Sequence, residues 1–403
     1  MYRRNRWLPV LGIILVLGIL LQLDLLVALS TALLVVLSVA TWWQKHALDG
    51  VTYRRKLHYK RGFPEEKTRL QLEVENRKLL PLSWLRTQDP WARAVGPEDD
   101  EVMAPSHIPD RGFLTNVFSL RWFERARRSY ILQFRKRGIY QVGPARLDSG
   151  DLFGFYEQTK EQGPVEYLTV FPSLLPLKEI DLPAEDPFGD RRSRRRLFED
   201  PNRPMGVREY RPEDSFRRVH WPATARTGQL QVKVYQPTSG QVMLICLNVS
   251  TFARHWEGVY PELLEHLIKF SATLINQGMQ EGYKVGLIAN GCLAHADQPF
   301  RIPPGRSHQQ LAHLLEALAG VTPVVTAPFE RFLLREAPRV PFGATLVVLT
   351  AVTSPELAQA LIQLKKHERR ITLISLALDI PPQIPGIQCL HRPFRAPDTE
   401  SEK

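Results

Sequence analysis

The residues with the clearest chemical potential fall in one stretch of the chain, Gly206 to Gln236. Glu209, Asp214 and His220 within it could form a general acid–base set, because positioned carboxylate and imidazole groups can transfer protons in a reaction. The sequence contains no nucleophile elbow, phosphate-binding loop, glycine-rich dinucleotide loop or pair of metal ligands to support such a set. An enzyme of unknown type therefore has to be weighed against a structural interpretation of the same residues.

In the structural interpretation, this stretch is a polar junction centred on aromatic side chains. Arginine forks pair well with carboxylates at close range, and a histidine beside a tryptophan is more often a satisfied core residue than a catalytic one. The residues expected to pair or pack here are Glu209, Asp214, Arg217, Arg218, His220, Trp221 and Arg226. We predict that the two carboxylates pair with these arginines. Arg218, Trp221 and Arg226 are the expected core of the junction.

A run of basic residues, Arg191 to Arg196, precedes this stretch. The whole chain has a net charge of +11, which favours anionic partners. The run could bind anionic lipid headgroups. Nucleic acid is a less favoured partner, because the sequence has no evident element for reading bases. The simplest interpretation of the run is a solvated, charged linker.

Two apolar segments open the chain, at about residues 7–23 and 25–43, and only Gln22 and Asp24 interrupt them. Each approaches the length of about 20 apolar residues that a membrane-spanning helix needs. Basic residues flank both ends, which favours the cytoplasmic side for both. We therefore predict a transmembrane hairpin over residues 1–49, with the soluble domains on the cytoplasmic side of the inner membrane. The alternatives are a signal peptide, whose cleavage site is missing, and one long helix, which would place Asp24 in lipid.

Residues 50–181 have the pattern of a β-rich domain. Leu70, Leu72 and Val74 alternate with polar residues, which is the period of a half-buried strand. Further short segments of this kind, separated by turn residues, predict a β-sandwich-like domain. The acidic, proline-rich segment Ala94–Asp110 is expected to be a loop.

Residues 241–392 change to an alternation of apolar strands and amphipathic helices. The first strand, Val242–Val249, is continuously apolar, as is typical of a buried parallel strand. Ser307, and Ser354 followed by Pro355, predict the starts of two helices. Strand and helix in alternation predict a doubly wound α/β domain, so the chain as a whole is expected to be an α+β multidomain protein.

Residues 182–240 join the two domains, first as the basic linker and then as the motif-bearing stretch described above. Because this segment lies between the β-rich and the α/β domain, we interpret it as an inter-domain clamp. Residues 393–403 are polar and predicted to be a disordered tail.

The chain resembles the proteins of domain-of-unknown-function family 58 in a motif of the type REY-x-P-x-D-x-x-R-x-x-HW-x-x-x-AR-x-G-x-L-x-V-K. The matching residues are Arg208, Glu209, Tyr210, Pro212, Asp214, Arg217, Arg218, His220, Trp221, Ala225, Arg226, Gly228, Leu230, Val232 and Lys233. An apolar hairpin, a β-domain and a C-terminal α/β domain accompany this motif, so the resemblance covers most of the chain.

In that family the C-terminal domain is similar to a von Willebrand factor type A domain. The intact domain holds a divalent cation with Asp-x-Ser-x-Ser at the end of its first strand. Here Asn248 replaces the Asp, Ser250 is kept and Phe252 replaces the second Ser. Since Mg²⁺ prefers oxygen ligands that include a carboxylate, we predict a degenerate site without metal or other cofactor.

Family members are commonly associated with MoxR-type AAA ATPases, and the family's activity is not established. The resemblance implies a membrane-anchored, non-catalytic interaction or scaffold protein that works with such an ATPase in the assembly or maturation of other proteins. Ligands of open α/β sheets bind at the C-terminal ends of the strands. The partner edge predicted on this basis consists of Ser250, Thr251, Thr322 and Thr350.

Overall fold

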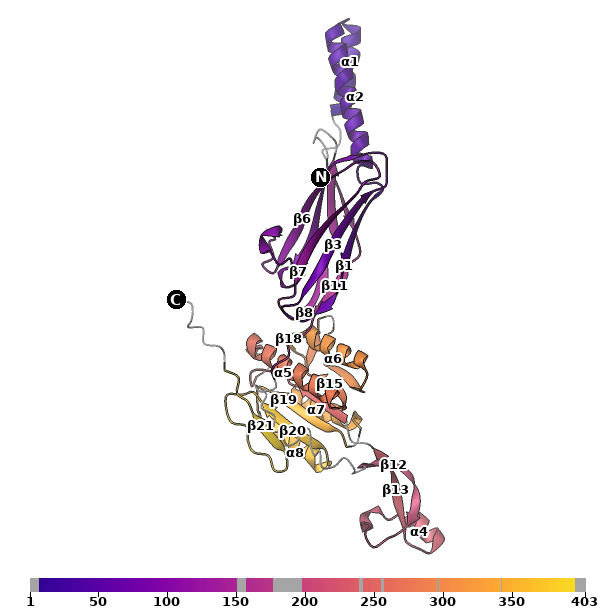
Figure 1. Cartoon of the computed structure of the whole chain (residues 1–403), viewed down its shortest axis with the longest axis vertical. Coiled ribbons are helices and arrows are strands. Elements are labelled where there is room, and N and C mark those ends of the chain that lie inside the picture. The colour runs from indigo at the N-terminus through magenta and orange to yellow at the C-terminus, as the bar shows by residue number, and fades with distance from the viewer. Residues whose placement is uncertain are drawn as a thin grey trace. The chain divides into compact units, whose positions relative to one another are not determined.

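The computed structural model describes residues 7–150, 157–176, 198–238, 242–254, 257–294, 296, 298–341 and 343–395. The chain divides into two compact units, Met1–Val170 and Phe171–Lys403, each with its own apolar core (Figure 1). The basic run Arg191–Arg196, most of the predicted linker and the tail beyond residue 395 lie outside the described residues.

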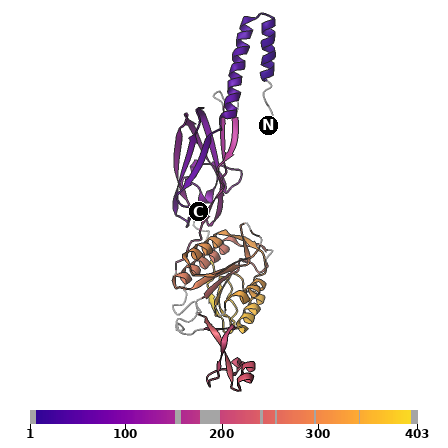
Figure 2. The ribbon, with the colours of Figure 1, turned by 90° about the vertical axis from the view of Figure 1, so that its right-hand side faces the viewer.

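Two apolar helices, α1 (Trp7–Leu20) and α2 (Asp24–His46), lie side by side at the start of the chain (Figure 2). Asp24 begins α2 with its side chain exposed, next to the turn between the helices. The stretch Asp24–Trp43 is apolar and long enough to cross a bilayer, whereas the apolar part of α1, Pro9–Leu20, is shorter. The predicted pair of apolar helices is present, and that both of them cross a membrane stays a prediction.

The rest of the first unit is made of strands, as the sequence predicts. One sheet has the order β1-β3-β7, with β1 (Val51–Leu57), β3 (Lys67–Asn76) and β7 (Arg125–Gln133). A second has the order β10-β9-β4-β6-β5, with β4 (Leu82–Ala92), β5 (Met103–Pro105), β6 (Arg111–Leu120), β9 (Ala145–Gly150) and β10 (Glu157–Gln162). A third has the order β2-β11-β8, with β2 (Arg61–Gly62), β8 (Gly138–Val142) and β11 (Glu166–Val170).

The alternation predicted for β3 is confirmed. Leu70, Leu72 and Val74 are fully buried in a core that they share with residues of the second sheet, such as Leu114 and Trp91. The expected loop at 94–110 is more ordered than the sequence suggests. It contains a 3₁₀ helix (Asp100–Val102) and the strand β5, which pairs with β6.

A buried ion pair joins the first two of these sheets. The Arg55 guanidinium on β1 donates to Asp89 Oδ1 on β4 at 2.9 Å, and the Tyr53 hydroxyl donates to Asp89 Oδ2 at 2.9 Å. Both the Arg55 and the Asp89 side chains are almost inaccessible to solvent. Burial raises the pKa of both Asp89 and Tyr53. Arg55 also pairs with Glu166 on β11, with its Nε 3.2 Å from Glu166 Oε2.

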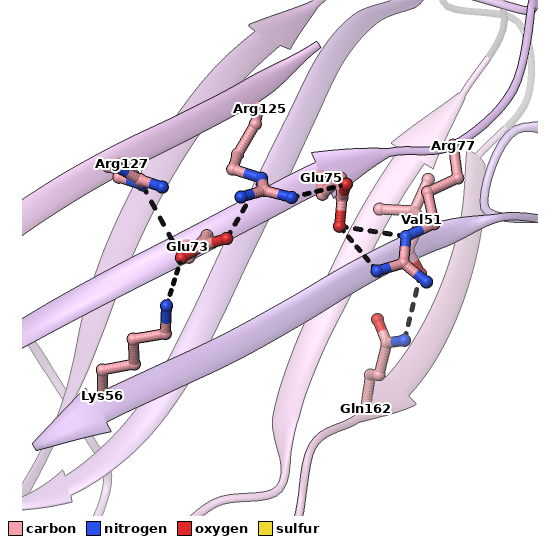
Figure 3. Close-up of polar contacts among 8 residues, drawn as sticks. All are labelled: Val51, Lys56, Glu73, Glu75, Arg77, Arg125, Arg127 and Gln162. Carbon is pink, nitrogen blue, oxygen red and sulfur yellow. Dashed lines mark hydrogen bonds and ion pairs between the residues drawn. The ribbon is translucent and has the colours of Figure 1, made fainter. Parts of the chain in front are cut away.

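The outward face of β3 carries a ladder of charged side chains (Figure 3). Glu73 lies among three cations. Its Oε2 is 2.9 Å from Lys56 Nζ and its Oε1 is 3.1 Å from Arg125 Nε. Arg127 Nε lies 3.6 Å from the same carboxylate. The hydrogen bond from Lys56 is the main cause that lowers the pKa of Glu73.

Glu75 points to the same face, two residues further along the strand (Figure 3). It accepts from Arg125 Nη2 at 2.9 Å and pairs with Arg77 Nη2 at 2.8 Å. These two hydrogen bonds, the one from Arg125 first, lower the pKa of Glu75 from 4.5 to about 2. Arg125 thus bridges Glu73 and Glu75 and ties β7 to β3 along its outer face.

The second unit contains a six-stranded sheet in the order β17-β15-β14-β19-β20-β21. The strands are β14 (Val242–Leu247), β15 (Lys284–Ala289), β17 (Phe300–Gly305), β19 (Thr345–Thr350), β20 (Arg370–Ser375) and β21 (Gln388–His391). β17 is antiparallel to its neighbour and the other five strands run parallel. A small second sheet pairs β16 (Gly291–Leu293) with β18 (Val321–Val325).

Helices cover both faces of the six-stranded sheet (Figure 2). They are α5 (Pro261–Gln280), α6 (His308–Gly320), α7 (Phe329–Glu336) and α8 (Pro355–Lys366). The pair α5 and α6 lies on one face and the pair α7 and α8 on the other. Ser307 and Ser354 cap α6 and α8 as predicted, each accepting a backbone N–H three residues ahead. The sequence did not predict β16, β17 or β18, because each is short and β17 contains two prolines at a sheet edge.

The motif-bearing stretch forms its own two-stranded sheet, separate from the six-stranded one. β12 (Phe198–Glu209) pairs antiparallel with β13 (Gln231–Thr238). A 3₁₀ helix (Phe216–Arg218) and the short helix α4 (Trp221–Thr227) lie in the connection between the two strands (Figure 1).

The charged ladder generates a prediction about acid stability. The pKa of Glu75 is about 2 in the folded chain against an ordinary value of 4.5, so its ion pairs stabilise the fold fully above pH 4.5. That contribution is expected to disappear as the pH falls from 4.5 towards 2. Urea midpoints of the full chain in detergent, measured by circular dichroism across this range, should fall more steeply for wild type than for Glu75→Gln. The control is Glu161→Gln on the exposed strand β10, which should keep the wild-type slope. Equal slopes for wild type and Glu75→Gln would contradict the prediction.

Candidate functional site

Three neighbouring parallel strands end in polar residues at one edge of the six-stranded sheet. Asn248 follows β14, Asn290 follows β15 and Thr350 ends β19. β14 lies between the other two, and the chain leaves it for β15 on one side before it reaches β19 on the other. Open α/β sheets bind ligands in the crevice at such a change of direction.

The side chain of Asn290 is fully buried and links these strand ends. Its Oδ1 accepts the backbone N–H of Val249 at 2.7 Å, and its Nδ2 donates to Asn248 Oδ1 at 3.1 Å. The same Nδ2 lies 3.3 Å from Ser250 Oγ and 3.2 Å from the carbonyl oxygen of Ala327. One amide therefore joins the loop after β14 to the segment before α7.

Asn248 extends these contacts to β19. We call the linked residues Asn248, Ser250, Asn290 and Thr350 the strand-end network. Its Nδ2 donates to Thr350 Oγ1 at 3.0 Å, and its Oδ1 accepts the backbone N–H of Ser250 at 3.1 Å. Thr350 Oγ1 donates in turn to the carbonyl oxygen of Val352 at 2.6 Å. Asn248 and Thr350 are both buried, and every group in the strand-end network is neutral. The members satisfy one another, as a buried polar network must if it is to be stable.

The chemistry of the strand-end network differs from that of a divalent-cation site. Mg²⁺ takes oxygen ligands with carboxylates among them, whereas Asn248 Oδ1 already accepts two N–H groups. Among the residues that the structure describes, no group of three or more His, Cys, Asp and Glu could hold a metal ion. The arrangement is suited to holding the three strand ends together.

A pocket of about 260 Å³ opens beside Asn248 and Ser250. Its apolar lining includes Phe252, Val325, Phe329, Val352 and Leu357. Two carboxylates also line it, Glu330 in the first turn of α7 and Glu356 in the first turn of α8. The pocket thus combines an apolar wall, a neutral polar floor and two acidic groups.

The four residues of the predicted partner edge are placed differently from one another. Ser250 and Thr350 belong to the strand-end network, and Thr251 Oγ1 accepts the backbone N–H of Tyr260 at 2.6 Å, just before α5. Thr322 lies on β18, where its hydroxyl donates to the carbonyl oxygen of Cys292 at 3.1 Å.

The loop threonine that reaches the strand ends is Thr326, which the sequence analysis did not single out. Its Oγ1 donates to the carbonyl oxygen of Asn290 at 2.7 Å. The physical reason is the antiparallel pairing of β18 with β16, which takes up residues 321–325 and delays the turn towards the strand ends. Asn290 was also missed as a site residue, although an Asn-Gly pair directly after a buried strand was visible as a strand end.

The hairpin of β12 and β13 carries the family motif, and the motif contains one ion pair with two hydrogen bonds. Its arginine is Arg208, whereas the predicted partners were Arg217, Arg218 and Arg226. Arg208 Nη1 and Nη2 each donate to an oxygen of Asp214 at 2.6 Å, a two-pronged contact. The backbone N–H of Arg211 adds a third hydrogen bond at 2.9 Å. These bonds, the one from Arg208 first, lower the pKa of Asp214. The pairing is local because Arg208 lies next to the end of β12, six residues before Asp214, and the turn brings them together.

The prediction that Trp221 lies in a packed core is wrong for the hairpin itself. The Trp221 side chain is 64% exposed and Phe216 is 65% exposed. Val219 and Val232 supply the buried contact instead, and a helix of seven residues has too little surface to cover a tryptophan at its first position. Arg226, in the last turn of α4, is also exposed.

The other motif residues stand at defined places around the hairpin. Arg218 lies over the ring of Tyr235 at 5.9 Å, and the rings of Tyr210 and Phe216 are 5.3 Å apart. Lys233 pairs across the strands with Val207, and Arg217 sits in the 3₁₀ helix. That the motif clamps the two domains together stays a prediction.

His220 has a structural task that explains its position. Its ring Nδ1 accepts the backbone N–H of Ala223 at 3.0 Å and so caps α4. The backbone N–H of His220 donates to the carbonyl oxygen of Gln231 at 2.7 Å. Of the proposed acid–base set, Asp214 is engaged by Arg208 and His220 by the helix cap, while Glu209 ends β12 with an exposed side chain.

Comparison with known proteins confirms the resemblance to family 58 over part of the chain. Residues 206–378 match the family described as Protein of unknown function DUF58. This segment runs from the hairpin through β20 of the six-stranded sheet. It therefore unites the motif with the α/β domain, and it leaves out the apolar helices and the β-rich domain.

The chain is also similar to the uncharacterized protein YeaD of Bacillus subtilis (strain 168). The two are 23% identical over 207 residues, which is 49% of this chain and 46% of YeaD. The chain thus matches about half the length of this curated relative.

Solved structures give only distant likenesses. The CARDB domain of the PF1109 protein from Pyrococcus furiosus has a TM-score of 0.20 and 11% identity, covering 30% of this chain and 91% of that one. A cohesin module from Clostridium perfringens has a TM-score of 0.22 and 9% identity, covering 30% and 96%. The sporulation control protein Spo0M of Bacillus subtilis has a TM-score of 0.19 and 15% identity, covering 30% and 49%. Scores this low carry no argument about function.

The hydrogen bonds of the strand-end network predict that a carboxylate at position 248 destabilises the fold. Asn248→Asp removes the donor to Thr350 and buries a charge, so we expect a loss of about 1–3 kcal/mol in the free energy of unfolding at pH 7. The same exchange at the half-buried Asn276 of α5 is the control and should cost clearly less. Adding MgCl₂ at constant ionic strength should leave the wild-type midpoint unchanged. A stabilised Asn248→Asp chain, or a wild type stabilised by Mg²⁺, would refute this account.

The capping role of His220 predicts which replacements the hairpin tolerates. His220→Ala loses the acceptor for the Ala223 N–H and should destabilise the hairpin locally by about 1 kcal/mol. His220→Asn keeps an acceptor that caps helices well and should retain most of that stability. Hydrogen exchange of the peptide that contains Ala223 measures both effects. Equal exchange rates in the two variants would show that the cap is not what matters at this position.

Proposed function

We propose, from the DUF58 match over residues 206–378, that this is a membrane-anchored, non-catalytic interaction or scaffold protein. In this proposal the α/β domain is von Willebrand factor type A-like and works without a metal ion. It presents the strand-end network and the adjoining pocket to a protein partner.

The observation that carries the proposal is the pocket beside Asn248 and Ser250. It lies at the change of strand direction, where sheets of this kind bind ligands. Its floor is a neutral network whose groups are already hydrogen-bonded, and such groups supply recognition rather than proton transfer. A volume of about 260 Å³ is small for a drug-sized ligand, and it suits a side chain that a partner inserts.

The state of the acid–base candidates supports a non-catalytic role. Asp214 is held by Arg208 and by the backbone of Arg211, and His220 caps α4. A general base needs a free lone pair within reach of a substrate. The hydrogen bonds that Asp214 and His220 form within the hairpin explain why these residues are present without assigning them a catalytic role.

The membrane anchor is proposed from the two apolar helices. α2 has the length of a membrane span, and basic residues flank the pair in the sequence. We propose a multi-pass anchor in the inner membrane with the soluble domains on the cytoplasmic side. The partner proposed from the family resemblance is a MoxR-type AAA ATPase, with which the protein would act in the assembly or maturation of other proteins.

A capture experiment tests the partner edge of this proposal. The tagged full chain is solubilised in detergent, and co-purified proteins are identified by mass spectrometry. Val352→Phe fills the pocket and is expected to remove the ATPase from the purified material. Val324→Phe is the matched control, because Val324 is 51% exposed on β18 and does not line the pocket.

Two outcomes would count against the proposal. One is that no ATPase or other protein depends on the intact pocket, so that wild type and Val352→Phe retain the same partners. The other is turnover of a substrate by the purified chain that both His220→Ala and His220→Asn abolish while the fold remains intact. The second result would establish catalysis at the hairpin instead.

A further inference from the structure

We infer that the pocket at the strand ends takes a basic side chain, an arginine or a lysine, from the protein partner. This inference rests on the proposed interaction function and names the chemistry that the partner edge recognises. Three observations lead to it: two carboxylates with no ion-pair partner among the described residues, an apolar wall, and a neutral polar network at the strand ends.

The first observation is that Glu330 and Glu356 line the same pocket. Among the described residues, neither side chain forms an ion pair or a hydrogen bond. Several other carboxylates of the described residues are paired, among them Glu73, Asp89 and Asp214. Acidic residues favour the first turn of a helix in any case, which explains their type but not their convergence on one pocket.

The second observation is the apolar wall. Phe252 and Phe329 line the pocket together with Val352 and Leu357. Arginine and lysine side chains bury their methylene stems against apolar surfaces while the charged head stays polar. A pocket with apolar walls and two acids suits such a side chain better than it suits a purely apolar or an acidic one.

The third observation is the floor of the pocket. A metal-bearing domain would bind a partner's carboxylate through its cation, and the strand-end network here has no charge to attract one. With two carboxylates and no cation, the electrostatic preference of the pocket is for positive charge, so the expected ligand has the opposite sign.

Small probes can test this on the full chain in detergent. Nα-acetyl-arginine amide and Nα-acetyl-lysine amide represent the two basic side chains, and Nα-acetyl-citrulline amide is a neutral match for the first. Binding is measured by saturation-transfer NMR and titration. A ligand of this size is expected to bind with a dissociation constant on the order of a millimolar.

The expected result is that one or both cationic probes bind and the citrulline probe binds at least about fivefold more weakly. Glu330→Gln and Glu356→Gln should each weaken the cationic probe by a similar factor, and the double variant by more. Glu262→Gln is the matched control, because Glu262 occupies the first turn of α5 and is not part of this pocket. It should leave probe binding unchanged.

The inference is overturned if the citrulline probe binds as well as the arginine probe, if no cationic probe binds, or if Glu262→Gln weakens binding as much as the pocket variants do. Its failure is distinguishable from failure of the proposed function. If a partner depends on Val352 but is retained by the Glu330→Gln/Glu356→Gln chain, the interaction function stands and the basic ligand does not. If the probes bind as expected while no partner depends on the pocket, the preference for a basic ligand stands and the interaction function does not.

Discussion

The amide of Asn290 bonds to two separate segments of the second unit, the loop after β14 and the segment before α7, and it does so where water cannot substitute for either of them. Parallel strands leave polar backbone and side-chain groups at their C-terminal ends, and a buried group of this kind costs about 1–3 kcal/mol if it stays unpaired. In this chain two asparagines and a threonine meet that requirement with neutral groups. A carboxylate and a metal ion could meet it in another way, but only with a full set of charged ligands. The choice of amides therefore fixes both the stability of the edge and the kind of ligand that the edge can recognise.

The hairpin that carries the motif is stabilised by a different principle. Its sheet has only two strands, and such a sheet is at best marginally stable without further support. Local polar bonds supply that support: Arg208 grips Asp214, and His220 caps α4 and bonds to Gln231 across the turn. Val219 and Val232 make the small buried contact. Asp214 and His220, which could be catalytic by residue type, thus stabilise the hairpin, and the aromatic residues Phe216 and Trp221 lie at the surface.

The sequence predicts much of this architecture because its signals are local. Alternation at Leu70, Leu72 and Val74, the continuous apolar run of β14 and the caps at Ser307 and Ser354 each depend on neighbours a few residues away. The strand-end network could not be read in the same way. Asn248, Asn290 and Thr350 are some 40 to 100 residues apart and meet only through the strand order. The family resemblance predicts a site at the run after β14, whereas Asn290, which links the strand ends, follows β15. Thr326 is equally hard to predict, because its contact with Asn290 depends on the pairing of β16 with β18.

Carboxylates in the two units differ in whether a cationic side chain of the described residues lies beside them. In the first unit, Glu73, Glu75 and Asp89 are each matched by arginine or lysine, so those charges are used to hold strands together. In the second unit, Glu330 and Glu356 converge on a pocket and find no cation among the described residues. A chain with a net charge of +11 has ample basic residues to neutralise two carboxylates. That Glu330 and Glu356 are nevertheless left without such a partner among the described residues favours a basic group supplied by a binding partner at this edge.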